Sequence, residues 1–411
     1  MLTPEQNRLL TSVEPGSAMG DYLRRYWHPI AGAADLDDNP IKPIRLFGEN
    51  LVLYRDLGGN YGLVERQCAH RSADLAYGFV EKCGIRCSYH GWVFDHGGRC
   101  VQQPFEETAL PGSRYKEKVR LVSYPVQEKA GLLFAYMGTG EPPLLPDWEP
   151  FSREDGFVQV VKADVPCNWF QCQENSIDPV HFEWMHSNWT GRMRDPDHDF
   201  GAAHERLGFE EFEHGFIYKR IRSDTDETDP LWTVGRVLLW PNGFFLGNHF
   251  EWRVPVDDEN TLSISWIYSE VPEERRAYRQ NKIPSWQSPI RDPETGRWIT
   301  THVINQDIIA WVGQGRITDR QRENLGQSDK GIVLMRNRFF RELAAMETGA
   351  EPKAIIRDPE QNHKVALAVA NRVSLGADAV SRKFILHAGQ PVEVREMCEA
   401  AMGYEIDAAG L

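Results

Sequence analysis

The sequence predicts an α+β protein with two units, a small antiparallel β domain and then a larger domain in which helices flank an antiparallel sheet. The chain has 411 residues, enough for two domains of ordinary size. Short alternating runs broken by Gly, Asn and Asp fill residues 44–137, whereas helical spacing dominates residues 304–349. A proline-rich stretch, residues 140–150, is the expected linker.

The first 30 residues are expected to form a helical segment that packs on the larger domain. Pro4–Leu10 has the pattern of a short amphipathic helix, and a second apolar-rich stretch, Tyr22–Trp27, stops at Pro29. The small β domain is expected over residues 31–143, where the segments DLGGN and DHGG are hairpin signals between β-rich runs.

The larger domain is expected over residues 144–411. Residues 169–186 form a polar and aromatic segment of helical character, and Ile332–Ala345 is the clearest later helix. Four stretches have the pattern of strands that line one pocket: Phe157–Val165, Gly208–Arg222, Trp232–Leu246 and Glu251–Tyr268.

Composition excludes several functional classes. The net charge of −14 argues against a nucleic-acid or anionic-membrane surface. No apolar run approaches the roughly 18 residues of a membrane helix, and the N-terminus lacks the pattern of a secretory signal, so a cytoplasmic protein is expected. The chain has seven cysteines, an odd number, which argues against a disulfide framework.

Two short segments carry metal-binding residue types. Cys68 and His70 are followed, after sixteen residues, by Cys87 and His90. Structural zinc sites usually group a Cys pair and then a His pair, whereas Cys-His and Cys-His suit a [2Fe–2S] cluster with two thiolates on one iron and two imidazoles on the other. Zinc, or four buried residues without chemistry, are the alternatives.

This pattern resembles the Rieske domain of non-haem iron oxygenases. Respiratory-chain Rieske proteins have an extra cysteine beside each ligand pair, but positions 73 and 89 here are Ala and Tyr. Cys83 and Cys100 fit neither ligand position and are expected to be ordinary buried thiols. His96 is expected to be a solvated turn residue.

An oxygenase of this kind needs a second metal, held by two imidazoles and one carboxylate. His181 and His186 lie five residues apart, about 140° apart on a regular helix, so two such ligands require a bent or ending helix. By themselves they could equally be helix-surface histidines beside a protein interface.

Residues 168–186 resemble the iron-binding motif of Rieske oxygenases. That resemblance makes His181 and His186 iron ligands and places Asn175 close to the iron. It makes Asp178 the bridge to a cluster histidine of a neighbouring subunit, a position in which a carboxylate can accept N–H groups from two imidazoles. Asp178 could also cap the helix.

The carboxylate ligand is expected farther along the chain. Resemblance to the phthalate-dioxygenase-like branch points to Asp307, in the segment Asn-Gln-Asp that opens an apolar helical run. Asp319, Glu323 and Asp329 are competitors, but they lie among Arg and Lys residues, which is typical of a solvated or salt-bridged stretch.

The resemblance implies a terminal oxygenase that uses dioxygen and electrons from a separate reductase, either directly or through a ferredoxin. No nucleotide fingerprint is present, so NAD(P)H would act only through that reductase. The family implies a homotrimer or a dimer of trimers. A Rieske electron-transfer protein without oxygenase activity is the alternative from another class.

An aromatic carboxylate is the expected substrate, with monooxygenation by O-demethylation or hydroxylation preferred over cis-dihydroxylation of the phthalate type. An anionic substrate needs a cationic or polar contact in an apolar pocket, and Arg236, Asn242 and His249 are the candidates. Arg253 is expected to pair with Asp257 or Asp258 instead.

Overall fold

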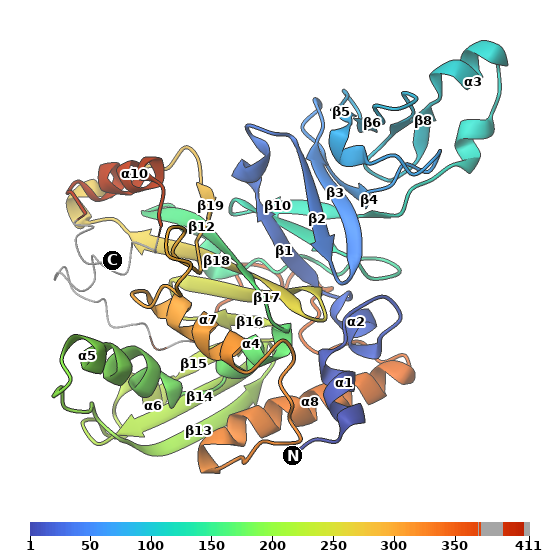
Figure 1. Cartoon of the computed structure of the whole chain (residues 1–411). Helices are drawn as coiled ribbons and strands as arrows, with labels where there is room; N and C mark the ends of the chain where they lie inside the picture. The colour runs from blue at the N-terminus through green and yellow to red at the C-terminus, as the bar shows by residue number, and fades with distance from the viewer. Residues whose placement is uncertain (369, 371–388, 407–411) are drawn as a thin grey trace.

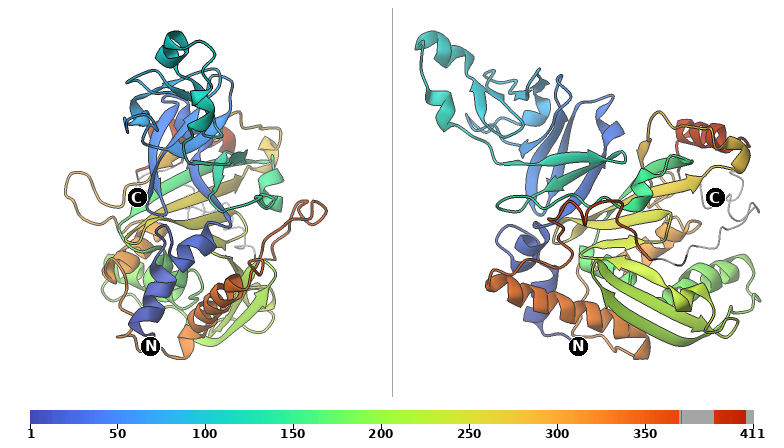
Figure 2. Two further views of the ribbon diagram at one scale, coloured as in Figure 1. Left: turned by 90° about the vertical axis from the view of Figure 1, so that its right-hand side faces the viewer. Right: turned by 180° about the vertical axis from the view of Figure 1, so that it is seen from behind.

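The computed structural model describes residues 1–368, 370 and 389–406. A β domain projects from a larger body built around one broad sheet, and the same separation is visible from three directions (Figures 1 and 2). The predicted α+β class is confirmed. Among the described residues no helix has the length and apolar character needed to cross a bilayer.

The N-terminal segment forms two helices, α1 (Pro4–Thr11) and α2 (Ala18–Leu23), which contact α8 (Lys330–Glu347) of the larger domain. The apolar stretch after α2 differs from the prediction, because it continues through Pro29 as strand β1 (Trp27–Gly32). β1 lies at the edge of its sheet and its register shifts just after Pro29, a position where a strand tolerates a residue without an N–H group.

Three small sheets build the β domain, in the orders β1-β11-β10, β2-β3-β4-β9 and β5-β6-β7-β8. A short helix, α3 (Pro104–Ala109), lies at the far end of this domain (Figure 2). The remaining strands are β2 (Ile41–Leu46), β3 (Glu49–Arg55), β4 (Tyr61–Glu65), β5 (Phe79–Val80), β6 (Ile85–Arg86), β7 (Val93–Phe94), β8 (Cys100–Gln102), β9 (Ser123–Tyr124), β10 (Val126–Lys129) and β11 (Leu132–Tyr136).

The larger domain contains an eight-stranded sheet in the order β13-β14-β15-β16-β17-β18-β12-β19. It is antiparallel except at one edge, where β19 runs parallel to β12, because the chain crosses over between β18 and β19. The strands are β12 (Gly156–Val165), β13 (His204–Phe212), β14 (Gly215–Arg222), β15 (Arg236–Leu239), β16 (Gly243–Phe245), β17 (His249–Asp257), β18 (Asn260–Glu270) and β19 (Ser285–Gln287).

Helices cover this sheet, and one group of them matters for the site. α4 contacts both β17 and α7, and α7 in turn contacts the helix η5. This packing brings residues near 181 against residues near 307. The helices are α4 (Trp169–Asn175), η5 (Phe182–Asn188), α5 (Trp189–Arg194), α6 (Pro230–Thr233), α7 (Val303–Gly313) and α10 (Val392–Met402).

Candidate metal centres

The cysteine and histidine pairs lie on two tight loops of the β domain. The first loop follows β4 and is closed by a hydrogen bond from Cys68 N to the carbonyl of Ala73 (2.8 Å). The second joins β6 to β7 and is closed from Cys87 N to the carbonyl of Trp92 (2.8 Å). Gly91 in this loop has a φ of 75°, which residues with side chains rarely adopt. The backbone therefore fixes both cysteines.

The four side chains form one group. Cys68 and Cys87 are each 2% exposed, His70 is half-buried and His90 is exposed. The rings of His70 and His90 lie 4.4 Å apart, and Trp92 stacks on His70 at 4.3 Å. The buried Nδ1 atom of His70 has no hydrogen-bond partner among the described residues. Two inner thiols and two outer imidazoles, one with an unpartnered nitrogen, fit a [2Fe–2S] cluster.

The electrostatics of the two cysteines also fit a metal site. Burial, and to a smaller extent the charge of the nearby Cys87, raise the pKa of the Cys68 thiol to about 12. Two adjacent thiolates are therefore stable only where metal ions offset their charge.

Charged residues that the sequence did not single out brace the two loops. Arg66 forms an ion pair with Asp74 (2.6 Å) across the first loop. Arg86 donates to the carbonyl of Gly91 (2.8 Å) and to Oε1 of Gln102 (2.8 Å) beside the second. Each arginine lies next to a strand end, a common place for a surface charge, so the sequence carried no signal for this role.

The remaining thiols of the β domain differ from one another. Cys100 is buried, as expected, but the prediction of a buried Cys83 is wrong, because Cys83 is exposed in the turn between β5 and β6. His96 is an exposed turn residue, as predicted.

In the larger domain, His181, His186 and Asp307 come together although they come from two distant segments. The Nε2 atoms of His181 and His186 lie 3.5 and 3.3 Å from Oδ1 of Asp307. Ligand atoms about 2.1 Å from a divalent metal and at right angles to each other are about 3 Å apart. The three atoms therefore fit one face of a metal coordination sphere.

The histidine spacing is accommodated by a π-helix, not by the expected bend or end of a regular helix. His181 precedes η5, a π-helix that contains His186. The hydrogen bonds of a π-helix run from residue i to residue i+5, so residues five apart return to nearly the same side. Glu183 on this helix is held by Arg220 (3.0 Å) and Arg222 (3.1 Å) from β14.

The charges of the group suit a divalent cation. Burial lowers the pKa of His181, which keeps its imidazole neutral at pH 7. Burial raises the pKa of Asp307, but the charge and hydrogen bond of His186 and the charge of His181 outweigh it, so the pKa stays below its usual value. Neutral imidazoles and an ionised carboxylate are the forms that bind metals.

Gln306, the neighbour of Asp307, orients His186. The ring Nδ1 of His186 donates to Oε1 of Gln306 (2.9 Å), which leaves Nε2 directed at Asp307. The amide of Gln306 donates to Oγ1 of Thr190 (2.8 Å) and to the carbonyl of Thr300 (2.9 Å). This role was not predicted, although Gln306 belongs to the Asn-Gln-Asp segment that pointed to Asp307.

Asp178 and Asn175 both lie beside this group. Oδ2 of Asp178 is 3.9 Å from Nδ1 of His181, and Oδ1 of Asp178 accepts the backbone N–H of Val180 (2.8 Å). This second contact closes the turn before the helix; the N-cap position is His181, so Asp178 does not cap the helix. Asn175 donates to Oδ1 of Asp307 (3.3 Å).

The competing carboxylates take part in other contacts. Glu323 pairs with Arg336 (2.7 Å), Asp319 accepts the N–H of Gln321 (3.2 Å), and Asp329 accepts the N–H of Gly326 (2.6 Å). Glu323 is salt-bridged and Asp319 is exposed, as expected for a solvated or salt-bridged stretch, whereas Asp329 closes a turn.

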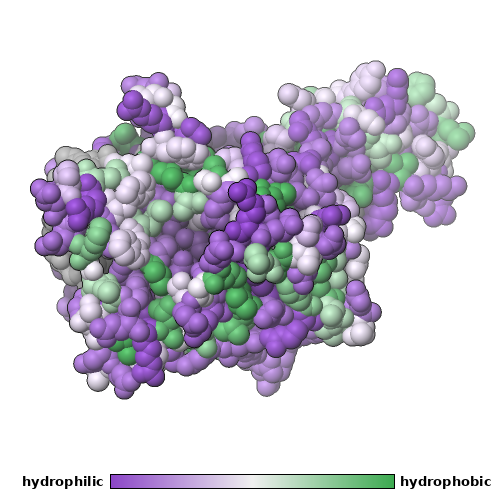
Figure 3. Space-filling view, turned by 60° about the horizontal axis from the view of Figure 1, so that its bottom comes forward, coloured by the Kyte–Doolittle hydropathy of each residue, from purple (hydrophilic) through white to green (hydrophobic). Residues whose placement is uncertain are grey.

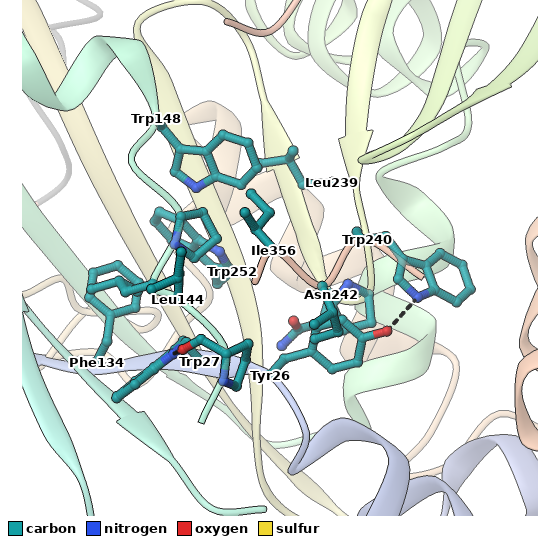
Figure 4. Close-up of a pocket in the computed structure, with 16 residues that line it drawn as sticks. Tyr26, Trp27, Phe134, Leu144, Trp148, Leu239, Trp240, Asn242, Trp252 and Ile356 are labelled. Carbon is teal, nitrogen blue, oxygen red and sulfur yellow. Dashed lines mark hydrogen bonds between the residues drawn. The ribbon is translucent and has the colours of Figure 1, made fainter. Parts of the chain in front are cut away.

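The three candidate substrate contacts have different surroundings. Arg236 is buried, and its guanidinium lies 4.6 Å from the ring centroid of Phe182. Phe182 itself lies between His181 and His186 in the sequence. Asn242 instead hydrogen-bonds His28 (3.2 Å) and lines an aromatic pocket beside Trp240 (Figure 4).

His249 begins β17, the strand that carries two buried charges. The expected pairing of Arg253 with Asp257 or Asp258 is wrong, because Arg253 pairs with Glu251 (2.6 Å) on the same face of β17. Residues two apart on a strand share a face, which explains the pairing.

The sequence is similar to known proteins over its whole length. Residues 26–125 match the Rieske [2Fe-2S] domain model, and residues 276–370 match the model described as LigXa C-terminal domain like. The 5,5'-dehydrodivanillate O-demethylase oxygenase subunit of Sphingobium sp. (strain NBRC 103272 / SYK-6) is 52% identical and covers 100% of this chain and 99% of its own length.

A more distant relative is the phthalate 4,5-dioxygenase oxygenase subunit of Pseudomonas putida, which is 30% identical over 85% of this chain and 88% of its own length. The fold is similar to that of carbazole 1,9a-dioxygenase in a solved oxygenase and ferredoxin complex, with a TM-score of 0.54, 20% identity, and coverage of 87% and 94%. The chain thus belongs to the Rieske non-haem iron oxygenases, as an oxygenase subunit of the phthalate-dioxygenase-like branch.

Proposed function

We propose that this oxygenase subunit removes an O-methyl group from an aromatic carboxylate of the lignin type, with electrons from a separate reductase. The observation that carries the proposal is a buried cation, Arg236, which lies on the ring of Phe182, and this ring packs against His181 and His186. The O-demethylase name of the 52% identical relative supports the same reaction.

In this proposal His181, His186 and Asp307 hold a mononuclear Fe(II), and Asn175 restrains the Asp307 carboxylate. Iron bound there would supply dioxygen activation next to the substrate. The balanced reaction takes a methoxyarene, O2, two electrons and two protons to a phenol, formaldehyde and water. Hydroxylation of the methyl carbon gives a hemiacetal, and this collapses to the two organic products.

Arg236 is the residue proposed to bind the substrate carboxylate. Its Nε and Nη1 atoms are buried without hydrogen-bond partners, and no carboxylate pairs with it in the part of the chain that the structure describes. A buried guanidinium is costly without an anion, and a carboxylate can satisfy it with two parallel hydrogen bonds. Phe182 below it offers an apolar surface for the ring, and His249 is a second proposed contact.

Electrons are proposed to enter at a cluster held by Cys68, His70, Cys87 and His90. The exposed edge of His90 is the natural entry point for a reductase or ferredoxin, like the ferredoxin of the carbazole complex. Asp178 would accept an N–H from His181 and from a cluster histidine of a neighbouring copy, which implies a homotrimer or a dimer of trimers.

Exposed aromatic residues give the projecting end of the β domain a surface for such contacts. Tyr77, Phe79 and Tyr89 are 75%, 58% and 60% exposed, and hydrophobic residues are visible on the projecting domain in Figure 3. A reductase supplied with NAD(P)H is in keeping with the cytoplasmic location expected from the sequence.

Product analysis with 18O2 tests the proposal. Methoxylated and plain aromatic acids are incubated with the subunit, a matched reductase and NAD(P)H. O-demethylation predicts one formaldehyde per phenol, with label in the formaldehyde before exchange with water. A labelled cis-diol from plain acids would establish cis-dihydroxylation of the phthalate type instead.

Metal content separates the other classes. An oxygenase holds about three irons per chain, an electron-transfer protein with a cluster alone about two, and a zinc-binding protein none. A colourless protein, or one with two irons after full Fe(II) loading, would overturn the proposal.

A further inference from the structure

Three turns meet at the end of the β domain that lies away from the cluster loops. β6 runs from the turn at residues 81–84 to the second cluster loop, and β7 runs back to the turn at residues 95–99. Asp56, Cys83 and His96 each place one ligand atom in this region, and these atoms all lie within 4.8 Å of one another. Neither the cluster nor the mononuclear centre uses any of them.

The backbone around the three residues is held tightly. Gly84 N donates to Oδ2 of Asp56 (3.1 Å), and Leu57 N donates to the carbonyl of Glu81 (2.8 Å), so two of the turns are bonded together. Gly84 has a φ of 97°, and a Cβ atom on it would overlap the carbonyl of Phe94 in β7. The three turns therefore present their side chains without further rearrangement.

Tyr54 supplies an independent observation. It is fully buried, and its hydroxyl has no hydrogen-bond partner among the described residues. Tyr54 lies near the end of β3, and Asp56 directly follows that strand. Burial raises the pKa of its hydroxyl, and the charges of Asp56, Asp95 and Cys83 raise it further. An unsatisfied buried hydroxyl beside them requires a polar partner.

Asp56 has room for one more ligand. Its Oδ1 atom accepts the N–H groups of Gly58 and Asn60 (2.9 Å each). The side-chain amide of Asn60 lies 3.2 Å from both carboxylate oxygens, so one long hydrogen bond is shared between them. Oδ2 can release its share of this bond and direct the lone pair to a cation.

We propose that Asp56, Cys83 and His96 form a site for a divalent cation of the zinc type. Thiolate, imidazole and carboxylate are the three donors that Zn²⁺ binds, and a fourth tetrahedral position remains for water. The Tyr54 hydroxyl would hydrogen-bond that water or the ligand oxygen. A bound ion would tie the three turns together.

Alkylation of Cys83 tests the site directly, because Cys83 is exposed and the other six cysteines are buried. The holoenzyme is treated with iodoacetamide with and without Zn²⁺, and modification of the Cys83 peptide is followed by mass spectrometry. Zn²⁺ should slow alkylation by at least about tenfold. His96→Ala should reduce this protection to less than about twofold, although the Cys83 thiol is still present in that variant. His363→Ala, another exposed histidine, should keep it.

Equal protection in the wild type and in His96→Ala would overturn the site, since the thiol alone would then bind the metal. Absence of protection in the wild type would overturn it as well. Asp56→Asn is not used, because Asp56 also caps its turn. Co²⁺ gives a second readout: the wild type should show a thiolate-to-cobalt absorption band that Cys83→Ser lacks. Tyr54→Phe should weaken Co²⁺ binding several-fold, and unchanged affinity would exclude the hydroxyl from the site.

Discussion

The two candidate metal centres of this oxygenase subunit are assembled from segments that differ greatly in their separation along the chain. The candidate cluster residues all lie between residues 68 and 90, on loops closed by their own backbone hydrogen bonds. The candidate iron residues join η5 to α7, and the hydrogen bond that orients His186 spans 120 residues of sequence. The first centre includes the exposed His90, whereas in the second Asp307 is buried and both histidines are half-buried.

The two centres are therefore stabilised by different parts of the structure. Local turns fix the cluster loops, so changes elsewhere should leave them intact. The iron group depends on the packing of α4, η5 and α7, which long-range ion pairs stabilise. Substitutions in the larger domain should therefore separate the two centres.

The largest expected effect is that of His181→Ala. Loss of one of two imidazoles should remove the mononuclear iron, lower the iron content from about three to about two per chain, and abolish turnover while the visible spectrum of the cluster remains. Cys87→Ser is the converse variant, which should lose the visible spectrum. Loss of that spectrum in His181→Ala would mean that the two sites are misassigned.

Asp178→Asn should break the connection between the centres without emptying either of them. Both metals should remain, because Asp178 is not a proposed ligand. Turnover should fall at least about 100-fold, because one carboxylate oxygen becomes an NH2 donor that cannot accept an imidazole N–H. Iron analysis and steady-state oxygen consumption measure the two effects. The control Asp199→Asn, at an exposed aspartate, should keep the iron content and turnover of the wild type. Normal turnover in Asp178→Asn would reject the bridging role.

Local patterns predicted most of the fold. Alternation identified the strands of the larger sheet, and the apolar spacing of residues 332–345 lies within α8. The parallel strand β19 and the strand that runs through Pro29 were missed, because both depend on a partner strand far away in sequence. Register and direction are tertiary properties that a single segment does not encode.

The sites divide in the same way. The Cys-His spacing located the cluster loops, whereas the contact between His186 and Asp307 needed the resemblance, since nothing near residue 186 specifies residue 307. The π-helix was not predicted, because five-residue spacing is equally compatible with a bent helix. Gln306 was overlooked since its role exists only once α7 packs on η5.

Gln306→Met tests the single hydrogen bond that orients His186. Methionine has a similar size but cannot accept the Nδ1–H of His186, so the ring should lose its orientation and Fe(II) affinity should fall about 10- to 100-fold. Cluster absorbance should be unchanged. Fe(II) titration of protein stripped of its mononuclear iron measures the effect, and Gln314→Met, exposed at the end of α7, is the matched control. Unchanged affinity would mean that packing alone orients His186.

Glu174→Gln probes the long-range support with the smallest expected effect on chemistry. Glu174 is buried between Arg320 (2.6 Å) and Arg336 (2.6 Å), partners 146 and 162 residues away. Removal of its charge leaves the buried guanidinium of Arg320 uncompensated and Arg336 paired with Glu323 alone among the described residues, which should cost about 3 kcal/mol of unfolding free energy at pH 7. The exposed Glu347→Gln should cost almost nothing.

The pH dependence of this difference checks its electrostatic origin. Burial raises the pKa of Glu174, but Arg320 and Arg336 outweigh it and hold the pKa below the usual 4.5. A carboxylate with a depressed folded-state pKa stabilises the protein above its unfolded pKa and loses that effect as the pH falls through the folded value. The gap between the wild type and Glu174→Gln should therefore be full at pH 6–7 and shrink below about pH 4.5. Acid sensitivity of the cluster is common to both proteins and cancels in the difference. Urea unfolding monitored by tryptophan fluorescence measures it, and a gap that stays constant down to pH 3.5 would show that Glu174 acts through its shape and not through its charge.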